Sequence, residues 1–130
     1  MMKNPENSKV VVLFEVTPTA EGKVRYLELA AQLKLLLSDA KGFIHSERFS
    51  SLNEEGKLLS LNVWENEESV KKWRNELHHR MSQSEGRARL FENYRITVAS
   101  VIREYDDSNR SEAPADSNEY FHNKQADDRL

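Results

Sequence analysis

The sequence contains no cysteine, and this absence narrows the chemistry that the chain can perform. Without a thiol there is no disulfide, no thiolate nucleophile and no zinc–sulfur site, and nothing points to an oxidising compartment. No apolar run approaches the roughly 20 residues that a helix needs to cross a bilayer. The polar segment from Met1 to Ser8 carries no apolar signal stretch. We therefore expect a cytoplasmic protein without membrane contact.

Phosphate-binding loops and metal-ligand patterns are missing as well. The four glycines are isolated from one another, so none belongs to a loop that cradles a phosphate, and a nucleotide cofactor is not expected. No His-x-x-x-His spacing occurs, and no carboxylate pair stands at ligand spacing. The acidic run at residues 65–68 is typical of a helix start. The sequence thus predicts no resident cofactor and no metal.

The composition favours one folded domain. Hydrophobic residues make up 38% of the 130 residues and charged residues 32%, a balance that is typical of a globular chain of this length. The formal charge of -3 supplies no basic field for a phosphate backbone. Nucleic acid is therefore not an expected partner.

Hydrophobic periodicity predicts six elements in the order strand, helix, strand, strand, helix, strand. The strands are expected at residues 10–16, 43–49, 58–64 and 95–102, with helices at 21–41 and from 67 onward. Thr19 and Asn66 are candidate N-caps for the two helices. This order predicts an α+β, ferredoxin-like βαββαβ fold with a four-stranded antiparallel sheet.

Composition also suggests the domain boundaries. Residues 1–9 form a polar N-terminal segment, and residues 10–105 form the ferredoxin-like domain. Residues 106–130 are acidic and have few large apolar side chains, too few to offset the entropy lost on ordering. We therefore expect this last segment to be a disordered tail.

The first strand predicts a homodimer. Val10, Val12, Phe14 and Val16 fall on one face of it, while Val11 and Leu13 fall on the other. Two helices can cover one face of the sheet only, so the second apolar face needs another cover. The same face of a second copy of the chain is the simplest one.

Three passages resemble the antibiotic biosynthesis monooxygenase family. They are the Gly-Phe start of the second strand at residues 42–43 and the stretches at 61–69 and 91–105, and the match spans about Val10 to Tyr105. The resemblance implies a dimeric α/β barrel with a pocket between sheet and helices. Members oxygenate aromatic polyketides without a bound cofactor, degrade heme, or act on quinols.

The heme-degrading branch of that family fits the sequence poorly. The resemblance implies an axial histidine and a tryptophan on the second helix, and an asparagine on the first strand. Trp73 matches the tryptophan, but Glu15 stands where the asparagine is expected. His78 and His79 follow Trp73 by five and six residues, about 120–140° around a continuous helix. We therefore predict weak heme binding or none.

His45 and Glu47 are the candidate catalytic pair. They stand two apart on a predicted strand, on a face that alternation assigns also to Phe43 and Phe49. A hydrogen bond between them would orient the imidazole for acid or base work. The alternative is a satisfied histidine–carboxylate pair at the dimer seam.

Four further residues are candidates for the substrate pocket. Trp73 is either a pocket wall or an ordinary core tryptophan, and Tyr94 is placed to cap the pocket. Ser60 and Asn62 share a strand face with Trp64, where they bind the partner sheet, line the pocket or meet water. The family resemblance implies a small monooxygenase that acts on flat aromatic molecules such as quinols or polyphenols, and these residues are its candidate pocket. The alternatives are a ligand-binding or associating dimer without turnover and a heme-degrading enzyme.

Overall fold

The computed structural model describes residues 8–82 and 90–120, with the side chains of the second helix described as far as Leu77. Six elements follow one another in the predicted order. They are β1 (Val10–Pro18), α1 (Lys23–Leu37), β2 (Phe43–Ser50), β3 (Leu58–Trp64), α2 (Glu67–Ser82) and β4 (Phe91–Ser100). The predicted ferredoxin-like βαββαβ fold is confirmed.

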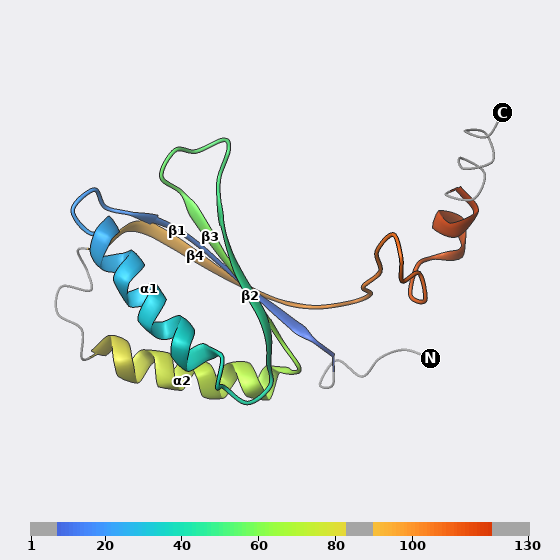
Figure 1. Ribbon diagram of the computed structural model, residues 1–130, viewed down its shortest axis with the longest axis horizontal. Coiled ribbons are helices and arrows are strands. Elements are labelled where there is room, and N and C mark those ends of the chain that lie inside the picture. Colours follow the sequence, from blue (N-terminus) through green and yellow to red (C-terminus); the bar gives the residue numbers. More distant parts are fainter. Residues whose placement is uncertain (1–7, 83–89, 121–130) are drawn as a thin grey trace. The chain divides into compact units, whose positions relative to one another are not determined.

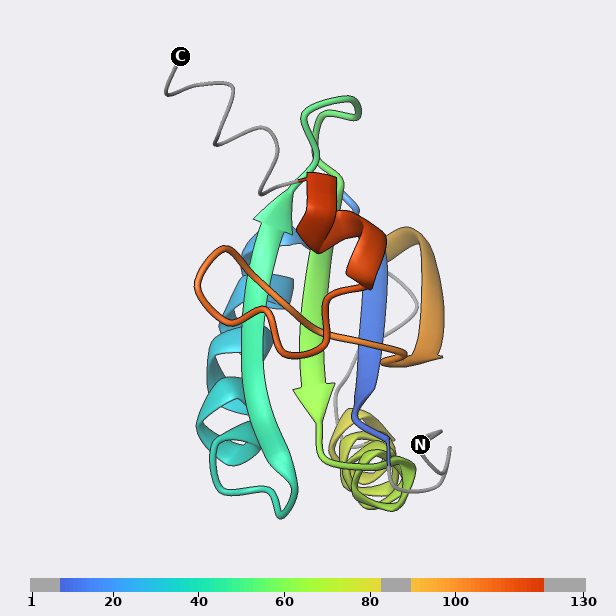
Figure 2. The same ribbon diagram turned by 90° about the vertical axis from the view of Figure 1, so that its right-hand side faces the viewer.

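The four strands form one antiparallel sheet in the order β2-β3-β1-β4. Both helices lie on the same side of this sheet (Figure 1). In Figure 2, turned by 90°, α1 lies behind β2 and α2 is seen end-on below the strands. We call the side that carries the helices the inner face and the opposite side the outer face.

β1 presents apolar side chains to both faces, as its sequence predicts. Val10 and Val16 are buried on the inner face, while Val11 and Leu13 are half-buried on the outer one. The central position of β1, between β3 and β4, places these side chains in the middle of the sheet. A central strand with two apolar faces requires cover on both sides.

The core lies at the inner-face end of the sheet where β1 begins and β3 ends. Val10, Leu37, Trp64 and Val70 form it, joining two strands and both helices. Trp64 is fully buried, and substitution of such a side chain with alanine typically costs about 3–5 kcal/mol. Trp73 packs against this cluster from α2 and is itself only half-buried.

The helix ends are fixed by local hydrogen bonds, which match the sequence prediction at one helix only. The Asn66 side chain accepts a hydrogen bond from the Ser69 backbone N–H at 2.9 Å, so it caps α2 as predicted. The prediction for α1 is wrong, since its N-cap is Gly22. The Thr19 hydroxyl instead accepts the Gly22 N–H at 2.8 Å in the turn before the helix.

Gly42 connects α1 to β2 at a position that only glycine can fill. Its φ of +86° lies in the left-handed region. A Cβ atom there would lie 1.9 Å from the Ser69 hydroxyl oxygen, so any side chain would force α2 away. The Gly42 carbonyl also accepts the Glu65 N–H at 2.8 Å, which ties this turn to the end of β3.

The chain divides into two compact units, Met1–Ser100 and Val101–Leu130. The domain boundary at Tyr105 stays a prediction. Within the second unit the Asp106 side chain accepts the backbone N–H groups of Ser108 and Asn109, and residues 115–120 are helical. Residues 106–120 thus form local hydrogen bonds. That residues 106–130 form a disordered tail stays a prediction.

Candidate functional site

Four of the six candidate residues lie on the inner face of the sheet or on the helix that covers it. Ser60 and Asn62 share the face of β3 that carries Trp64, and Tyr94 stands opposite Val16 on β4. Trp73 reaches the same side from α2, where its ring lies 6.1 Å from that of Trp64. The structure thus assembles the predicted pocket residues on one side of the sheet.

Aromatic rings gather at the two ends of this inner face. At the core end Trp64 packs against Trp73 and against Phe43, whose ring centroid is 5.6 Å away. The buried indole N–H of Trp64 has no hydrogen-bond partner in the described part of the chain, and such an unpaired group typically costs about 1–3 kcal/mol. We call these three residues the tryptophan end.

The other end is formed by four rings grouped around Phe91. Phe91 lies 6.0 Å from Phe14, 5.5 Å from Tyr26 and 6.0 Å from Tyr94, and all three ring pairs meet edge to face. Tyr94 is 60% exposed, so its ring is the accessible side of this group. We call these four residues the tyrosine end.

Polar side chains separate the two aromatic ends. Ser60 and Asn62 are half-buried, and neither side chain has a hydrogen-bond partner in the part of the chain that the structure describes. Asn62 pairs with Ser46 on β2, and Ser60 pairs with Arg48. Half-buried polar groups without protein partners bind water or a ligand. The inner face therefore offers hydrogen bonds between two aromatic surfaces.

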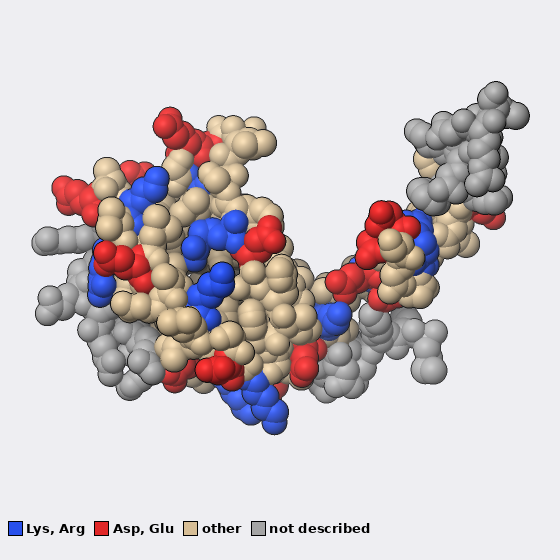
Figure 3. All heavy atoms as spheres, viewed as in Figure 1, with Lys and Arg blue, Asp and Glu red and all other residues tan. Residues whose placement is uncertain are grey.

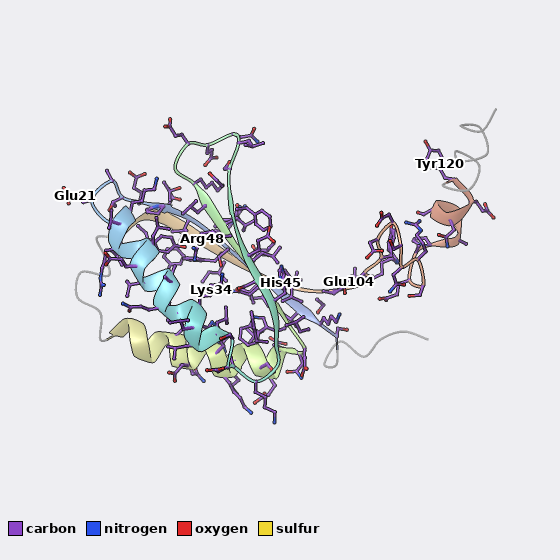
Figure 4. All side chains as sticks on the ribbon, viewed as in Figure 1. Glu21, Lys34, His45, Arg48, Glu104 and Tyr120 are labelled. Carbon is purple, nitrogen blue, oxygen red and sulfur yellow. The ribbon has the colours of Figure 1, made fainter. Side chains whose placement is uncertain are left out.

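Arg48 belongs to this face although the sequence did not single it out. Its guanidinium lies 5.8 Å from the centre of the Tyr26 ring on α1, within cation–π range, and Figure 4 labels Arg48 in this region. Burial raises the pKa of the Tyr26 phenol, an effect that Arg48 partly opposes. The sequence could have indicated this residue, because the predicted hairpin pairs Arg48 with Ser60, a candidate pocket residue.

His45 and Glu47 form the predicted pair but lie on the outer face. The His45 Nε2 atom is 3.8 Å from a Glu47 carboxylate oxygen, and both side chains are more than half exposed. The prediction that Phe43 shares their face is wrong. The β2–β3 register shifts between Phe43 and His45, so Phe43 pairs with Trp64 on the inner face while His45 pairs with Val63.

Glu15 also lies on the outer face, in a charged cluster. The Arg95 Nε–H donates to its carboxylate at 2.7 Å, and the Lys57 ammonium approaches within 3.3 Å. The hydrogen bond from Arg95 is the main cause that lowers the Glu15 pKa. Glu15 therefore serves an ion pair between strands, away from the residues around Asn62.

The remaining predictions concern heme and metals. α2 is unbroken from Glu67 to Ser82, as the interpretation of His78 and His79 assumes, and the side chains of these two histidines lie outside the described residues. Residues 8–77 and 90–120 contain no group of three or more metal-ligating side chains. No helix in the described part of the chain is both long and apolar enough to span a membrane.

Comparison with known proteins identifies the family. The family model for antibiotic biosynthesis monooxygenase matches residues 9–84, so the chain belongs to this family. The jasmonate monooxygenase ABM of Pyricularia oryzae is 37% identical over 90 residues, which are 69% of this chain and 42% of that protein. The chain thus matches less than half the length of this relative.

Solved structures share the fold at lower identity. SnoaB, a cofactor-independent oxygenase from Streptomyces nogalater, superposes with a TM-score of 0.60 and 10% identity, over 75% of this chain and 96% of SnoaB. MhuD, solved as a mutant with two manganese protoporphyrin IX molecules per active site, gives a TM-score of 0.60 and 13% identity over 75% and 98%. These likenesses establish the fold.

Proposed function

We propose that the chain is a small monooxygenase that acts on a flat aromatic molecule of the quinol or polyphenol type without a nucleotide cofactor. The substrate binds between the helices and the inner face of the sheet, against Asn62. One observation carries this proposal: in a chain of the antibiotic biosynthesis monooxygenase family, polar side chains without a hydrogen-bond partner among the described residues stand between two aromatic surfaces.

The inner face suits such a substrate for physical reasons. Trp73 and Tyr94 offer ring surfaces for stacking, and both keep part of that surface accessible. The Asn62 amide and the Ser60 hydroxyl are placed to bind ring oxygens and to stabilise the negative charge that develops when a phenol is deprotonated. The helices on this side limit the access of water, which strengthens those interactions.

The reaction balances without a cofactor. A phenol can tautomerise to a ketone with an adjacent methylene, and oxidation of that methylene to a carbonyl by O₂ releases one molecule of water. The substrate itself supplies the electrons. SnoaB, described as a cofactor-independent oxygenase, and the jasmonate monooxygenase support oxygenation as the activity of this chain.

The same proposal includes a homodimer in which the outer faces of two sheets pack together. Val11 and Leu13 give the outer face an apolar centre, and the Glu15–Arg95 ion pair and the His45–Glu47 contact flank it. In this arrangement the His45–Glu47 pair lies at the seam between subunits. The catalytic role for this pair stays the competing prediction.

Labelled oxygen tests the proposed activity. The purified protein is incubated with a panel of naphthalene and anthracene quinols under isotopically labelled O₂, and products are analysed by mass spectrometry. We expect one labelled atom per product molecule at a rate well above the autoxidation of the quinol alone. Unlabelled product, or a rate equal to autoxidation across the panel, would refute the activity.

One observation favours a second candidate, a dimer that binds small molecules without turnover. Within the described residues, the candidates on the inner face include no histidine and no carboxylate to serve as acid or base. Quinol binding without consumption of O₂ would support this function. A hemin titration tests the third candidate, for which we expect no sharp Soret band at one heme per chain.

A further inference from the structure

Among the described residues, Arg48 is a cation on the inner face that forms no ion pair with a carboxylate. Its guanidinium lies 5.8 Å from the centre of the Tyr26 ring. The other described arginines of the sheet and of α1 differ in this respect. Arg95 binds Glu15, and Arg25 lies 3.4 Å from Glu28. A guanidinium left without a carboxylate beside unpaired hydroxyl and amide groups is suited to bind an anion.

The neighbours of Arg48 complete a site of defined chemistry. Ser60 stands opposite Arg48 in the β2–β3 pair, so the two side chains begin about 4.5–5.5 Å apart. Asn62 and Ser46 form the adjacent pair on the same face. Hydroxyl, amide and guanidinium donors thus lie side by side on two neighbouring strands. Together they can bind the carboxylate oxygens of a ligand and the oxygen atoms attached to its ring.

The spacing along β3 limits the size of the ligand. A strand advances about 6.6 Å per two residues, so Ser60 lies roughly 13 Å from Trp64 along the strand. A bicyclic ring compound with a carboxylate group spans most of this distance. Its ring would lie against Trp73 at the tryptophan end while its carboxylate reaches Arg48.

We infer that Arg48 is a specificity-determining residue that binds the carboxylate of an aromatic acid substrate, with Tyr26 as the residue that positions its guanidinium. This inference rests on the proposed function, since it names the substrate class for the same inner-face site. Tyr26 is held by Phe91 and is nearly fully buried, so it fixes the guanidinium plane at the edge of the site. Burial raises the pKa of the Tyr26 phenol, so this ring stays neutral beside the guanidinium.

An anaerobic binding experiment tests the inference separately from catalysis. The full chain is titrated calorimetrically with 1,4-dihydroxy-2-naphthoate and with uncharged 1,4-naphthalenediol. We expect the carboxylate to bind about tenfold more tightly, the ratio that a charge-assisted hydrogen bond typically gives. Arg48→Gln should remove this preference while the diol binds as before, and Arg48→Lys should keep part of it.

Controls separate the possible failures. Arg25→Gln removes the same charge from the exposed surface of α1 and should leave both affinities unchanged. If Arg48→Gln fails to fold, the affinity of the native chain for both probes is measured at increasing NaCl concentration. Added NaCl should weaken binding of the naphthoate and not of the diol. Equal affinity for both probes would overturn the role of Arg48 and leave the proposed site standing. Failure of both probes to bind would overturn the site itself.

Discussion

The two faces of the sheet carry different kinds of side chain on the same strands. On the inner face aromatic rings flank polar groups, such as those around Asn62, that have no hydrogen-bond partner within residues 8–77 and 90–120. On the outer face the polar groups are already paired, as in the Glu15–Arg95 and His45–Glu47 contacts, around an apolar centre. Polar groups without a protein partner are available to bind a ligand. Polar groups that are already paired around an apolar patch are typical of the rim of an interface.

The two faces of the sheet do not differ in overall charge. Acidic and basic groups are mixed over the surface seen in Figure 3, and no large field of one sign covers it. Recognition of a charged ligand therefore depends on single residues in defined positions, such as Arg48 beside Tyr26. Long-range electrostatic steering is not required.

The largest expected effect comes from removal of a polar group from the inner face. Asn62→Ala should lower the turnover of the quinol identified by labelled oxygen about 10²–10³-fold, the loss typical for one donor to a developing oxyanion. The matched control is Asn93→Ala, an asparagine on the outer face of β4 opposite Thr17. We expect less than a threefold effect there. Equal losses from both variants would show that the two faces do not differ in function.

The outer face is tested by a charge at its centre. Leu13 lies between Leu61 and Thr97 on the central strand, so Leu13→Glu would bury a carboxylate in the proposed dimer contact. We expect dimer dissociation to become about a hundredfold easier, measured by sedimentation velocity over a concentration series. Leu52→Glu, at a fully exposed position in the hairpin turn, is the control. A native chain that sediments as a monomer at micromolar concentration would refute the dimer itself.

Much of this arrangement could be read from the sequence, because strand alternation has a strict period of two. The assignment of Ser60 and Asn62 to the Trp64 face needed only that period. The N-cap of α2 followed from Asn66 and the acidic residues after it. These features depend on neighbours in the sequence.

The errors arise where distant contacts or an extra residue intervene. The register shift at Phe43/His45 reverses the alternation of β2, and nothing in the local sequence marks it. Arg48 was overlooked because its significance depends on Tyr26, which approaches from α1.

A small effect is expected at His45, and this prediction separates the two sequence-based interpretations of its pair with Glu47. Since the imidazole is on the outer face, His45→Ala should change turnover less than threefold. Ser46→Ala, one residue along and on the face of Asn62, should cost more. A loss of a hundredfold from His45→Ala, in a preparation that keeps its dimer and melting temperature, would make the outer face the catalytic one.

The smallest effect concerns the pH dependence of stability at Glu15. Arg95 lowers the pKa of this carboxyl in the folded state, so its contribution to stability is present above the ordinary value of 4.5 and is lost as the pH falls through the lowered value. The native chain should therefore be more resistant to urea than Glu15→Gln at neutral pH, with a difference that shrinks steadily below about pH 4.5. Urea midpoints at pH 7, 5, 4 and 3 measure this difference.

The control is Glu55→Gln, in the exposed hairpin turn, which should differ little from the native chain at any pH. Because dissociation of the proposed dimer would expose Glu15 and weaken this ion pair, the same series in the Leu13→Glu background should show a smaller pH-dependent difference. A difference independent of pH in the native background would show that Glu15 acts through packing and not through its charge.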